Sequence, residues 1–191
     1  MVYTTKKRLV LGISGASGAI LAIEILKLLK ENNEWEVHLV ISKGAKKTIA
    51  LETDYKLDDI NNLADKTYAI EDIGASIASG TFKTEGMIII PCSMKTVAGI
   101  ACGYSDNLLL RAADVTIKEN RKLILAVRES PLSTIHLKNM LSLANLGVTI
   151  MPLMISYYNK PHTLEEINRN FVARILDKIG IEADGLDRWG E

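Results

Sequence analysis

The segment RLVLGISGASG, residues 8–18, decides the fold of this chain. It begins with a short apolar run that ends at glycines, a pattern typical of a strand buried in a parallel sheet. The glycine-rich turn leads directly into AILAIEILKLLK, residues 19–30. In this stretch the charged residues Glu24, Lys27 and Lys30 recur among apolar residues at the spacing of a helix. These stretches together predict a strand, a tight turn and a helix, which form the first unit of an α/β domain.

The same alternation continues along the rest of the chain. Further strands are predicted at residues 36–42, 87–91, 122–127 and 148–151, and further helices at residues 44–51, 95–102, 106–119, from about Pro131 to Leu146, and 163–179. Residues 53–85 mix charged and small side chains and predict short elements and a mobile loop. Because strands alternate with helices, we expect one α/β domain over residues 1–191 with a mainly parallel sheet.

The composition is that of an ordinary globular protein. A chain of 191 residues can bury a sizeable core, and 48% hydrophobic with 24% charged residues are common proportions. Lys+Arg and Asp+Glu both number 23, so the chain lacks the basic excess expected of a protein that binds nucleic acid. A net charge of zero also offers little repulsion against self-association.

The cysteines, the histidines and the termini exclude further classes of protein. Cys92 and Cys102 give neither a disulfide framework nor metal-ligand spacing, and the three histidines are scattered. No run approaches the ~20 apolar residues of a membrane span. The basic N-terminus is not followed by a cleavage-like segment. We therefore expect a cytoplasmic protein without a metal centre or a membrane span.

The predicted strand ends locate the candidate site. In parallel α/β sheets, ligands bind beyond the carboxyl ends of the strands. Here those ends are residues 12–18, Ser42, residues 91–96, residues 128–129 and Pro152. Any ligand of this chain is expected to lie among these five places.

The turn GISGASG, residues 12–18, suits an anionic ligand. Its small residues let the backbone approach the ligand closely, and the N–H groups of the following helix point at it. Ser14 and Ser17 add hydroxyl donors. The pattern differs from the dinucleotide-binding motif and from the Walker motif. A tight turn that needs small residues only for packing is the alternative.

The segment PCSMKT, residues 91–96, follows a predicted strand and begins a helix. Ser93 is suited to cap that helix. A second polar helix N-terminus at the same edge of the sheet favours a role in ligand binding beyond capping. Cys92 lies in an apolar setting, which indicates an unreactive packing cysteine.

Two groups of charged residues are candidates for phosphate binding and proton transfer. Arg111 and Lys118 lie seven residues apart on one predicted helix face, which suits a phosphate, although a solvated face has the same pattern. Arg128 directly follows a predicted strand, and at that position its planar guanidinium could bind phosphate oxygens. Glu129 could move a proton, or it could form a salt bridge or stabilise a helix start.

Tyr158 and Arg174 form a third candidate group. The tyrosine hydroxyl and the guanidinium could together hold a phosphate. Without other information, both would be interpreted as surface residues.

Several long motifs in order resemble the UbiX-type flavin prenyltransferases. They are GISGASG, PCSMKT, DNLLLRAADV, the pattern RESPLSxIHLxNML, the pattern RxLDxIGI and the pair Arg188-Trp189. The resemblance covers nearly the whole chain. Its specificity comes from the number and order of the motifs.

The resemblance implies a flavodoxin-like, Rossmann-like domain with three layers, α/β/α, which assembles into a dodecamer with active sites between subunits. The C-terminal tail, about residues 180–191, would pack on a neighbouring subunit. Reduced flavin mononucleotide (FMN) and dimethylallyl monophosphate would bind without a metal. The five-carbon unit would join flavin N5 and close a ring at C6. The prenylated FMN would pass to a decarboxylase of the UbiD type.

The resemblance also implies roles for individual residues. Flavin contacts would come from Gly15, Ala16, Ser17, Ser42, Ser93, Met94, Lys95, Thr96 and Arg128. The prenyl phosphate would be held by Arg111, Lys118, Tyr158 and Arg174. Ser17 would touch both ligands, Glu52 and Glu129 would lie near the phosphate and the proton transfers, and Trp189 of a neighbouring subunit would face the prenyl group.

One loop departs from the family pattern. Residues 152–158 read PLMISYY, whereas the family has a second proline in a pattern like PxMPxFY. The missing proline frees the backbone at Ile155, so the path of the loop that carries Tyr158 stays open. The donor, monophosphate or diphosphate, also stays open. So does the acceptor of the C6 proton, which is either Glu129 or the released phosphate.

Two other functions are compatible with a flavin site on this fold. A flavin-dependent cysteine decarboxylase would carry a motif of the type PxMNxxMW, but Pro152 is followed here by Leu-Met-Ile. A flavin carrier without catalytic activity would have no clear use for Arg111, Lys118, Arg174 and Glu129. The prenyltransferase is therefore the leading hypothesis.

Overall fold

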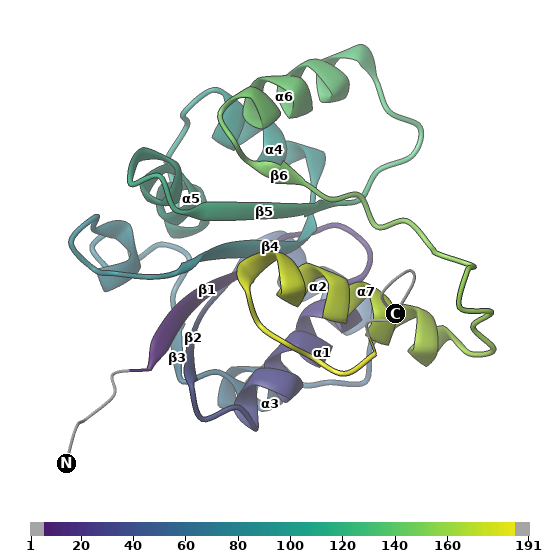
Figure 1. Ribbon diagram of the computed structural model, residues 1–191. Coiled ribbons are helices and arrows are strands. Elements are labelled where there is room, and N and C mark those ends of the chain that lie inside the picture. The colour runs from purple at the N-terminus through teal and green to yellow at the C-terminus, as the bar shows by residue number, and fades with distance from the viewer. Residues whose placement is uncertain (1–5, 186–191) are drawn as a thin grey trace.

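The computed structural model describes residues 6–185 and shows a six-stranded sheet between two layers of helices. The strand order is β3-β2-β1-β4-β5-β6, and every neighbouring pair is parallel. The strands are β1 (Lys7–Ile13), β2 (Trp35–Ile41), β3 (Lys66–Tyr68), β4 (Gly86–Cys92), β5 (Lys122–Val127) and β6 (Thr149–Ile150). This arrangement confirms the predicted α/β class and the parallel sheet (Figure 1).

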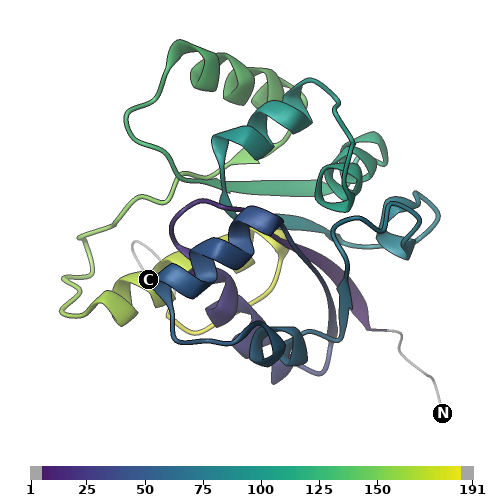
Figure 2. The same cartoon turned by 180° about the vertical axis from the view of Figure 1, so that it is seen from behind.

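The helices divide between the two faces of the sheet. They are α1 (Ala19–Lys30), α2 (Lys43–Glu52), α3 (Leu57–Leu63), α4 (Met94–Ala101), α5 (Leu108–Lys118), α6 (Thr134–Asn145) and α7 (Leu164–Ile179), with a 3-10 helix, η1, at Ser76–Ala78. Side chains of α1, α2, α3 and α7 build one apolar core, and those of η1, α4, α5 and α6 build the other. Figure 2 shows the two helical layers from behind. The expected α/β/α layering is therefore present.

β1 lies near the middle of the sheet and is covered on both sides. Leu9 and Leu11 point into the first core, whereas Val10 points into the second, so the strand is apolar on both faces. Gly12 also faces the second core, where an added Cβ would collide with the side chain of Leu109 on α5. The glycine at this position is needed for close packing of helix on sheet.

The strand order reverses direction between β1 and β4. From β1 the chain proceeds outward to β2 and β3, and it then returns to build β4, β5 and β6 on the other side. Such a switch point leaves a crevice beyond the carboxyl ends of the two central strands, where ligands bind in open α/β sheets. The turn at residues 12–18 and the segment at residues 91–96 border this crevice, as the sequence predicts.

The segment between residues 53 and 85 contains the predicted short elements, α3, β3 and η1. Ile60, Tyr68 and Ile77 anchor these elements in the two cores. β4 extends one residue beyond its expected end at Pro91, to Cys92, and its pairing with β5 shifts in register between Ile89 and Cys92.

The last helix, α7, begins and ends close to its predicted range of residues 163–179. The Thr163 hydroxyl accepts a hydrogen bond from the N–H of Glu166, which caps the N-terminus of α7. The Glu166 carboxylate accepts from the N–H of His162, the residue before the N-cap, whereas in a regular capping box it would accept from the N–H of the N-cap itself. Gly180 ends the helix with a φ of 95°. Within residues 6–185, no helix is both long and apolar enough to cross a membrane.

Candidate active site

Ser14 ties together the two segments that border the crevice. Its side chain is buried, and its hydroxyl donates to the carbonyl of Pro91 at 2.9 Å and accepts from the N–H of Ser93 at 2.7 Å. The N–H of Ser14 also donates to Pro91, at 3.2 Å. The sequence predicted a hydroxyl that faces a ligand at this position. That prediction is wrong for Ser14, because its hydrogen bonds hold the two loops in register.

The N-terminus of α1 is occupied by a carboxylate of the chain itself. Glu52, the last residue of α2, accepts hydrogen bonds from the N–H groups of Gly18, at 2.9 Å, and Ala19, at 3.1 Å. A helix N-terminus is a favourable position for an anion. The sequence predicted that these N–H groups would meet an anionic ligand, whereas here they bind Glu52. This difference directs a ligand's phosphate to other donors in the crevice.

Ser17, Glu52 and Arg128 come together at this turn. Partial burial acts to raise the pKa of the Glu52 carboxyl. The hydrogen bonds from Ser17, Gly18 and Ala19, together with the charge of Arg128, outweigh burial, so the pKa lies below its ordinary value. Glu52 is therefore an anion at neutral pH. It can fix the hydroxyl of Ser17, an exposed residue of the turn.

Two further helix N-termini border the crevice. The Ser42 hydroxyl accepts from the N–H of Ala45 at 3.1 Å and caps α2, while the Ser93 hydroxyl accepts from the N–H of Thr96 at 3.4 Å and caps α4. The capping role predicted for Ser93 is thus confirmed. Helix geometry leaves the N–H groups of the first residues of α2 and α4 without partners inside the helix. These groups suit the phosphate or the polar edge of a bound flavin.

The turn between β1 and α1, residues 12–18, and the start of α2 are in direct contact. A Cβ at Gly15 would lie 2.9 Å from the Cα of Gly44, closer than packed atoms allow. Ala16 and Met94 have buried side chains, so a flavin contact from either residue would use its backbone. Lys95 is exposed, and the Thr96 hydroxyl pairs with that of Ser93 at 3.1 Å.

Arg128 and Glu129 directly follow β5, at the edge of the sheet formed by the carboxyl ends of the strands. The N–H of Arg128 donates to the carbonyl of Cys92 at 3.1 Å, which links β5 to β4 at the crevice. The Glu129 carboxylate accepts from the N–H of Ser130 at 3.0 Å and is exposed. Leu153 lies beside the turn, because its Cδ1 would be 3.1 Å from a Cβ at Gly18. The loop after β6 therefore lies beside the turn at residues 12–18.

Cys92 lies beneath this site and does not face it. Its side chain is completely buried, and burial raises the pKa of its thiol. The prediction of an unreactive packing cysteine is confirmed. Among residues 6–185, no group of three or more His, Cys, Asp or Glu side chains is arranged to hold a metal ion.

Arg111 and Lys118 lie apart from the crevice within one chain. Arg111 pairs with Asp114 at 2.8 Å, and Lys118 pairs with Glu119 at 2.6 Å. Lys118 comes just before β5 begins, so it lies toward the amino ends of the strands. Figures 1 and 2 both place α5 and α7 on opposite sides of the molecule. A site that combines these cations with Arg174 needs a second copy of the chain.

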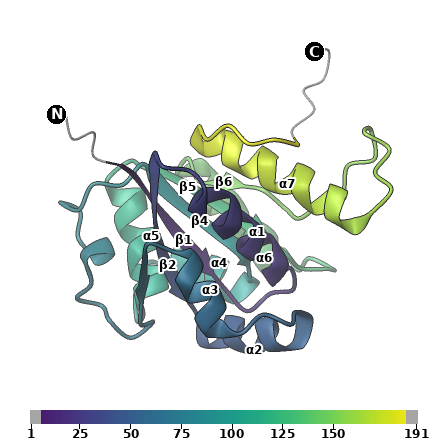
Figure 3. The same ribbon diagram turned by 90° about the horizontal axis from the view of Figure 1, so that it is seen from below.

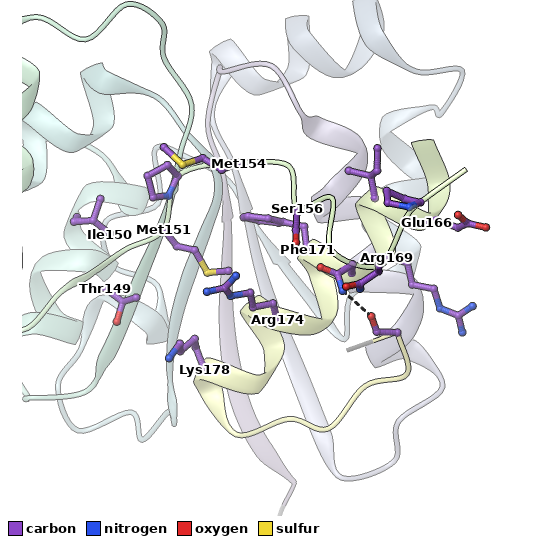
Figure 4. A pocket seen from close by; sticks show the side chains of 16 residues that line it. Thr149, Ile150, Met151, Met154, Ser156, Glu166, Arg169, Phe171, Arg174 and Lys178 are labelled. Carbon is purple, nitrogen blue, oxygen red and sulfur yellow. Dashed lines mark hydrogen bonds between the residues drawn. The ribbon is translucent and has the colours of Figure 1, made fainter. Parts of the chain in front are cut away.

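A cavity of about 460 Å³ lies between β6, the loop at residues 151–161 and α7. Figure 4 shows apolar side chains along one side, including Met151 and Phe171, and the cations Arg174 and Lys178 at one end. Arg174 is therefore placed as a candidate phosphate ligand. Tyr158 is 79% exposed and is not among the residues that line this cavity. Trp189 lies outside the described residues.

Comparison with known proteins places this chain in a family. A family model described as Flavoprotein matches residues 2–177. A probable UbiX-like flavin prenyltransferase of Sedimentibacter hydroxybenzoicus is 51% identical over 182 residues, which are 95% of this chain and 96% of the relative. The chain belongs to the UbiX-like flavin prenyltransferases. The resemblance that its motifs predict is thereby confirmed.

Solved structures of UbiX-like proteins share the fold over nearly their whole length. A dodecameric FMN-dependent UbiX-like decarboxylase of Escherichia coli O157:H7 has a TM-score of 0.93 and 51% identity, with 96% of this chain and 99% of that chain covered. AnUbiX (PadA1), in complex with FMN and dimethylallyl pyrophosphate, has a TM-score of 0.95 and 42% identity, with 98% and 99% covered. The flavodoxin-like fold of this UbiX-like chain is therefore established.

The site of this UbiX-like chain contains residues that the sequence did not single out. The turn at residues 12–18 was a predicted candidate, but no sequence signal pointed to the backbone hydrogen bonds from Gly18 and Ala19 to Glu52. Lys178 lines the same cavity as Arg174. Its position four residues after Arg174, on one helix face, is a signal that could have revealed it.

Proposed function

We propose that this chain transfers the dimethylallyl group of dimethylallyl phosphate to N5 and C6 of reduced FMN and so makes prenylated FMN. The observation that carries the proposal is the convergence of Ser17, Glu52, Arg128 and two polar helix N-termini on one crevice. The relative from Sedimentibacter hydroxybenzoicus is a probable UbiX-like flavin prenyltransferase, and AnUbiX (PadA1) was solved in complex with FMN and dimethylallyl pyrophosphate. Membership in this family favours the transferase over a cysteine decarboxylase.

The crevice offers suitable donors for FMN. Because Glu52 takes the N-terminus of α1, the flavin phosphate is directed toward the N-termini of α2 and α4. The proposed contacts are Gly15, Ala16, Ser17, Ser42, Ser93, Met94, Lys95, Thr96 and Arg128. When bound, reduced flavin supplies the nucleophilic N5 and C6 positions.

The charged residues of the chain are proposed to act on the prenyl phosphate. Breaking the carbon–oxygen bond leaves an anionic phosphate and an allylic cation. Cations around the phosphate stabilise the departing negative charge. The proposed cations are Arg174 of one chain and Arg111 and Lys118 of another, with Tyr158 as a hydroxyl donor. Trp189 would offer an aromatic face to the allylic cation.

Ser17, Glu52 and Glu129 are proposed to control protons and orientation. Glu52 holds the Ser17 hydroxyl toward the crevice, between the two proposed ligands. Glu129 is exposed at the end of β5, where it or the released phosphate would accept the C6 proton.

The separation of the cations supports a site built between subunits. We propose a dodecamer, the assembly named for the relative from E. coli O157:H7. α6 exposes apolar side chains that a second copy of the chain would cover, including Ile135, which is 68% exposed, and Leu141, which is 63% exposed. The chain is proposed to act as one domain whose C-terminal tail, about residues 180–191, packs on a neighbouring subunit.

The product is proposed to pass to a decarboxylase of the UbiD type. That partner, and the cytoplasmic location expected from the sequence, stay predictions. Fractionation of cells that produce the chain would test its location. Restoration of an apo-decarboxylase by the released flavin would test the partner.

An anaerobic incubation with separate arms tests the proposed function. The protein is mixed with reduced FMN and either dimethylallyl monophosphate, dimethylallyl diphosphate or a peptide with a C-terminal cysteine. We expect the mass of the flavin to increase by one five-carbon unit with at least one prenyl donor. Carbon dioxide release from the peptide, with an unchanged flavin mass in the prenyl arms, would instead identify a cysteine decarboxylase. Flavin binding without either reaction would identify a carrier.

A further inference from the structure

The cavity beside α7 has the size and polarity of a site for a small amphiphilic anion. Its volume of about 460 Å³ lies within the usual range for small-ligand pockets. Ile150, Met151 and Phe171 give it an apolar wall, and Arg174 and Lys178 give it a cationic end. The cavity begins where β6 ends, on the same edge of the sheet as the proposed flavin crevice.

The two cations belong to one face of one helix. Arg174 and Lys178 are separated by one turn of α7, a spacing that puts side chains side by side. Figure 4 shows both side chains pointing to the same side of the helix, toward Thr149 and Met151. Arg169 also lines the cavity, but its side chain packs against Gly185 and points the other way.

The charges of Arg174 and Lys178 have no ion-pair partner in the described part of the chain. Glu166 is the acidic residue that lines the cavity, and its carboxylate accepts from the N–H of His162 at 2.6 Å. Two neighbouring positive charges without a carboxylate partner favour a ligand with more than one negative charge.

We propose that Lys178 determines which prenyl donor this chain prefers, by binding the terminal phosphate of a diphosphate while Arg174 binds the phosphate next to the prenyl group. The planar guanidinium of Arg174 can engage two oxygens of one phosphate, and the flexible ammonium of Lys178 can reach the next phosphate along. The apolar wall would receive the prenyl chain. This inference rests on the proposed function, since it concerns the donor of that same transfer, and it leaves the bonds to the flavin unchanged.

The test measures donor preference in the full-length assembled protein. The ratio of kcat/KM for dimethylallyl diphosphate to kcat/KM for the monophosphate is determined anaerobically for the natural protein and for Lys178→Met. Methionine keeps much of the apolar stem and removes the charge. We expect the ratio to fall at least about tenfold, the loss typical of a charge-assisted hydrogen bond. Lys178→Arg, which keeps the charge, should restore most of the ratio.

Arg169→Met is the matched control, because it removes a cation from the same cavity and the same helix. We expect it to leave the ratio within about twofold. An unchanged ratio in Lys178→Met, or an equal fall in Arg169→Met, would overturn the assignment.

A binding measurement separates this inference from the proposed function. Calorimetric titration with inorganic pyrophosphate and with inorganic phosphate needs no turnover. We expect Lys178→Met to weaken the binding of pyrophosphate much more than the binding of phosphate. If the natural protein transfers no prenyl group from either donor, the proposed function is wrong, and the pyrophosphate titration still decides whether Lys178 binds a second phosphate. Equal binding of pyrophosphate by both proteins would refute the role of Lys178.

Discussion

Glu52 lies where the N-terminus of α1 would otherwise meet a ligand, and its charge should stabilise the fold. Replacing Glu52 by Ala removes the acceptor for Gly18 and Ala19 and should cost about 1 kcal/mol at pH 7, as the loss of a helix cap does. Chemical denaturation of both proteins measures this difference. Glu71→Ala is a control, because Glu71 pairs with Lys43 only at the surface and such pairs contribute little.

The effect of Glu52 should depend on pH in one direction. Its pKa is lowered in the folded chain, so its contribution is present above the ordinary glutamate value of about 4.3 and is lost as the pH falls through the lower folded value. The difference in unfolding free energy between the natural protein and Glu52→Ala should therefore shrink below about pH 4. A difference that grows on acidification would contradict this assignment.

Glu129 gives a second prediction at the scale of one residue. If Glu129 accepts the C6 proton, Glu129→Ala should lower kcat by about 100-fold or more, the usual contribution of a positioned base. FMN should still bind with nearly the natural affinity, because the proposed flavin phosphate contacts lie on α2 and α4. Single-turnover kinetics and flavin titration check the two parts. If turnover persists, the released phosphate is the better candidate for the acceptor.

The contact between the first turn and α2 is the feature to test at the scale of elements. Gly15→Ala would place a Cβ 2.9 Å from the backbone of Gly44 and force the two elements apart. We expect a loss of stability of about 1–3 kcal/mol, typical of overpacking, together with weaker FMN binding. Denaturation and flavin titration measure both effects.

Gly74→Ala is the matched control for that substitution. An added Cβ at Gly74 meets nothing closer than Asp72, at 3.7 Å, so stability and FMN binding should change little. Equal losses in Gly15→Ala and Gly74→Ala would show that the turn and α2 do not depend on this close approach.

Most elements could be predicted because their signals are local. β1 and α1 follow from an apolar run, a glycine-rich turn and a helical pattern, and α7 follows from its cap at Thr163 and its stop at Gly180. The last residue of β4 could not be predicted, because proline usually ends a strand and only the pairing of Cys92 with Val127 on β5 keeps Cys92 in the sheet.

The candidate site was only partly predictable because it depends on distant contacts. The five strand ends identified the edge of the sheet at which Ser17, Glu52 and Arg128 come together. The partners of Ser14 and Glu52 could not be deduced, because each reaches across the fold, from β1 to β4 and from α2 to α1. The spacing of residues along the sequence does not indicate such contacts.

At the scale of the whole molecule, the proposed active site needs residues from two copies of the chain. Ser17 lies in the turn just before α1, whereas Lys118 is the last residue of α5, and these two helices pack on opposite faces of the sheet (Figure 3). Ser17→Ala and Lys118→Met should each be nearly inactive alone. When both variants are produced together, random pairing should rebuild about a quarter of the sites with natural residues at both positions. Activity of the purified mixed oligomers tests this expectation.

One outcome of the mixing experiment would contradict a site shared between two chains. If mixed oligomers form but show no more activity than either variant alone, Ser17 and Lys118 do not serve the same site from different chains. Co-purification of two differently tagged variants establishes that the mixed oligomers exist.

The most direct test of the proposed transfer is the fate of a labelled prenyl carbon. The natural protein is incubated anaerobically with reduced FMN and a dimethylallyl phosphate carrying carbon-13 at the carbon bonded to oxygen, and the extracted flavin is examined by NMR. We expect the labelled carbon to be bonded to flavin N5, in a product whose C6 has lost its hydrogen to ring closure. Recovery of the label only as unreacted donor or free prenyl alcohol, with an unaltered flavin, would contradict the assignment of this chain as a flavin prenyltransferase.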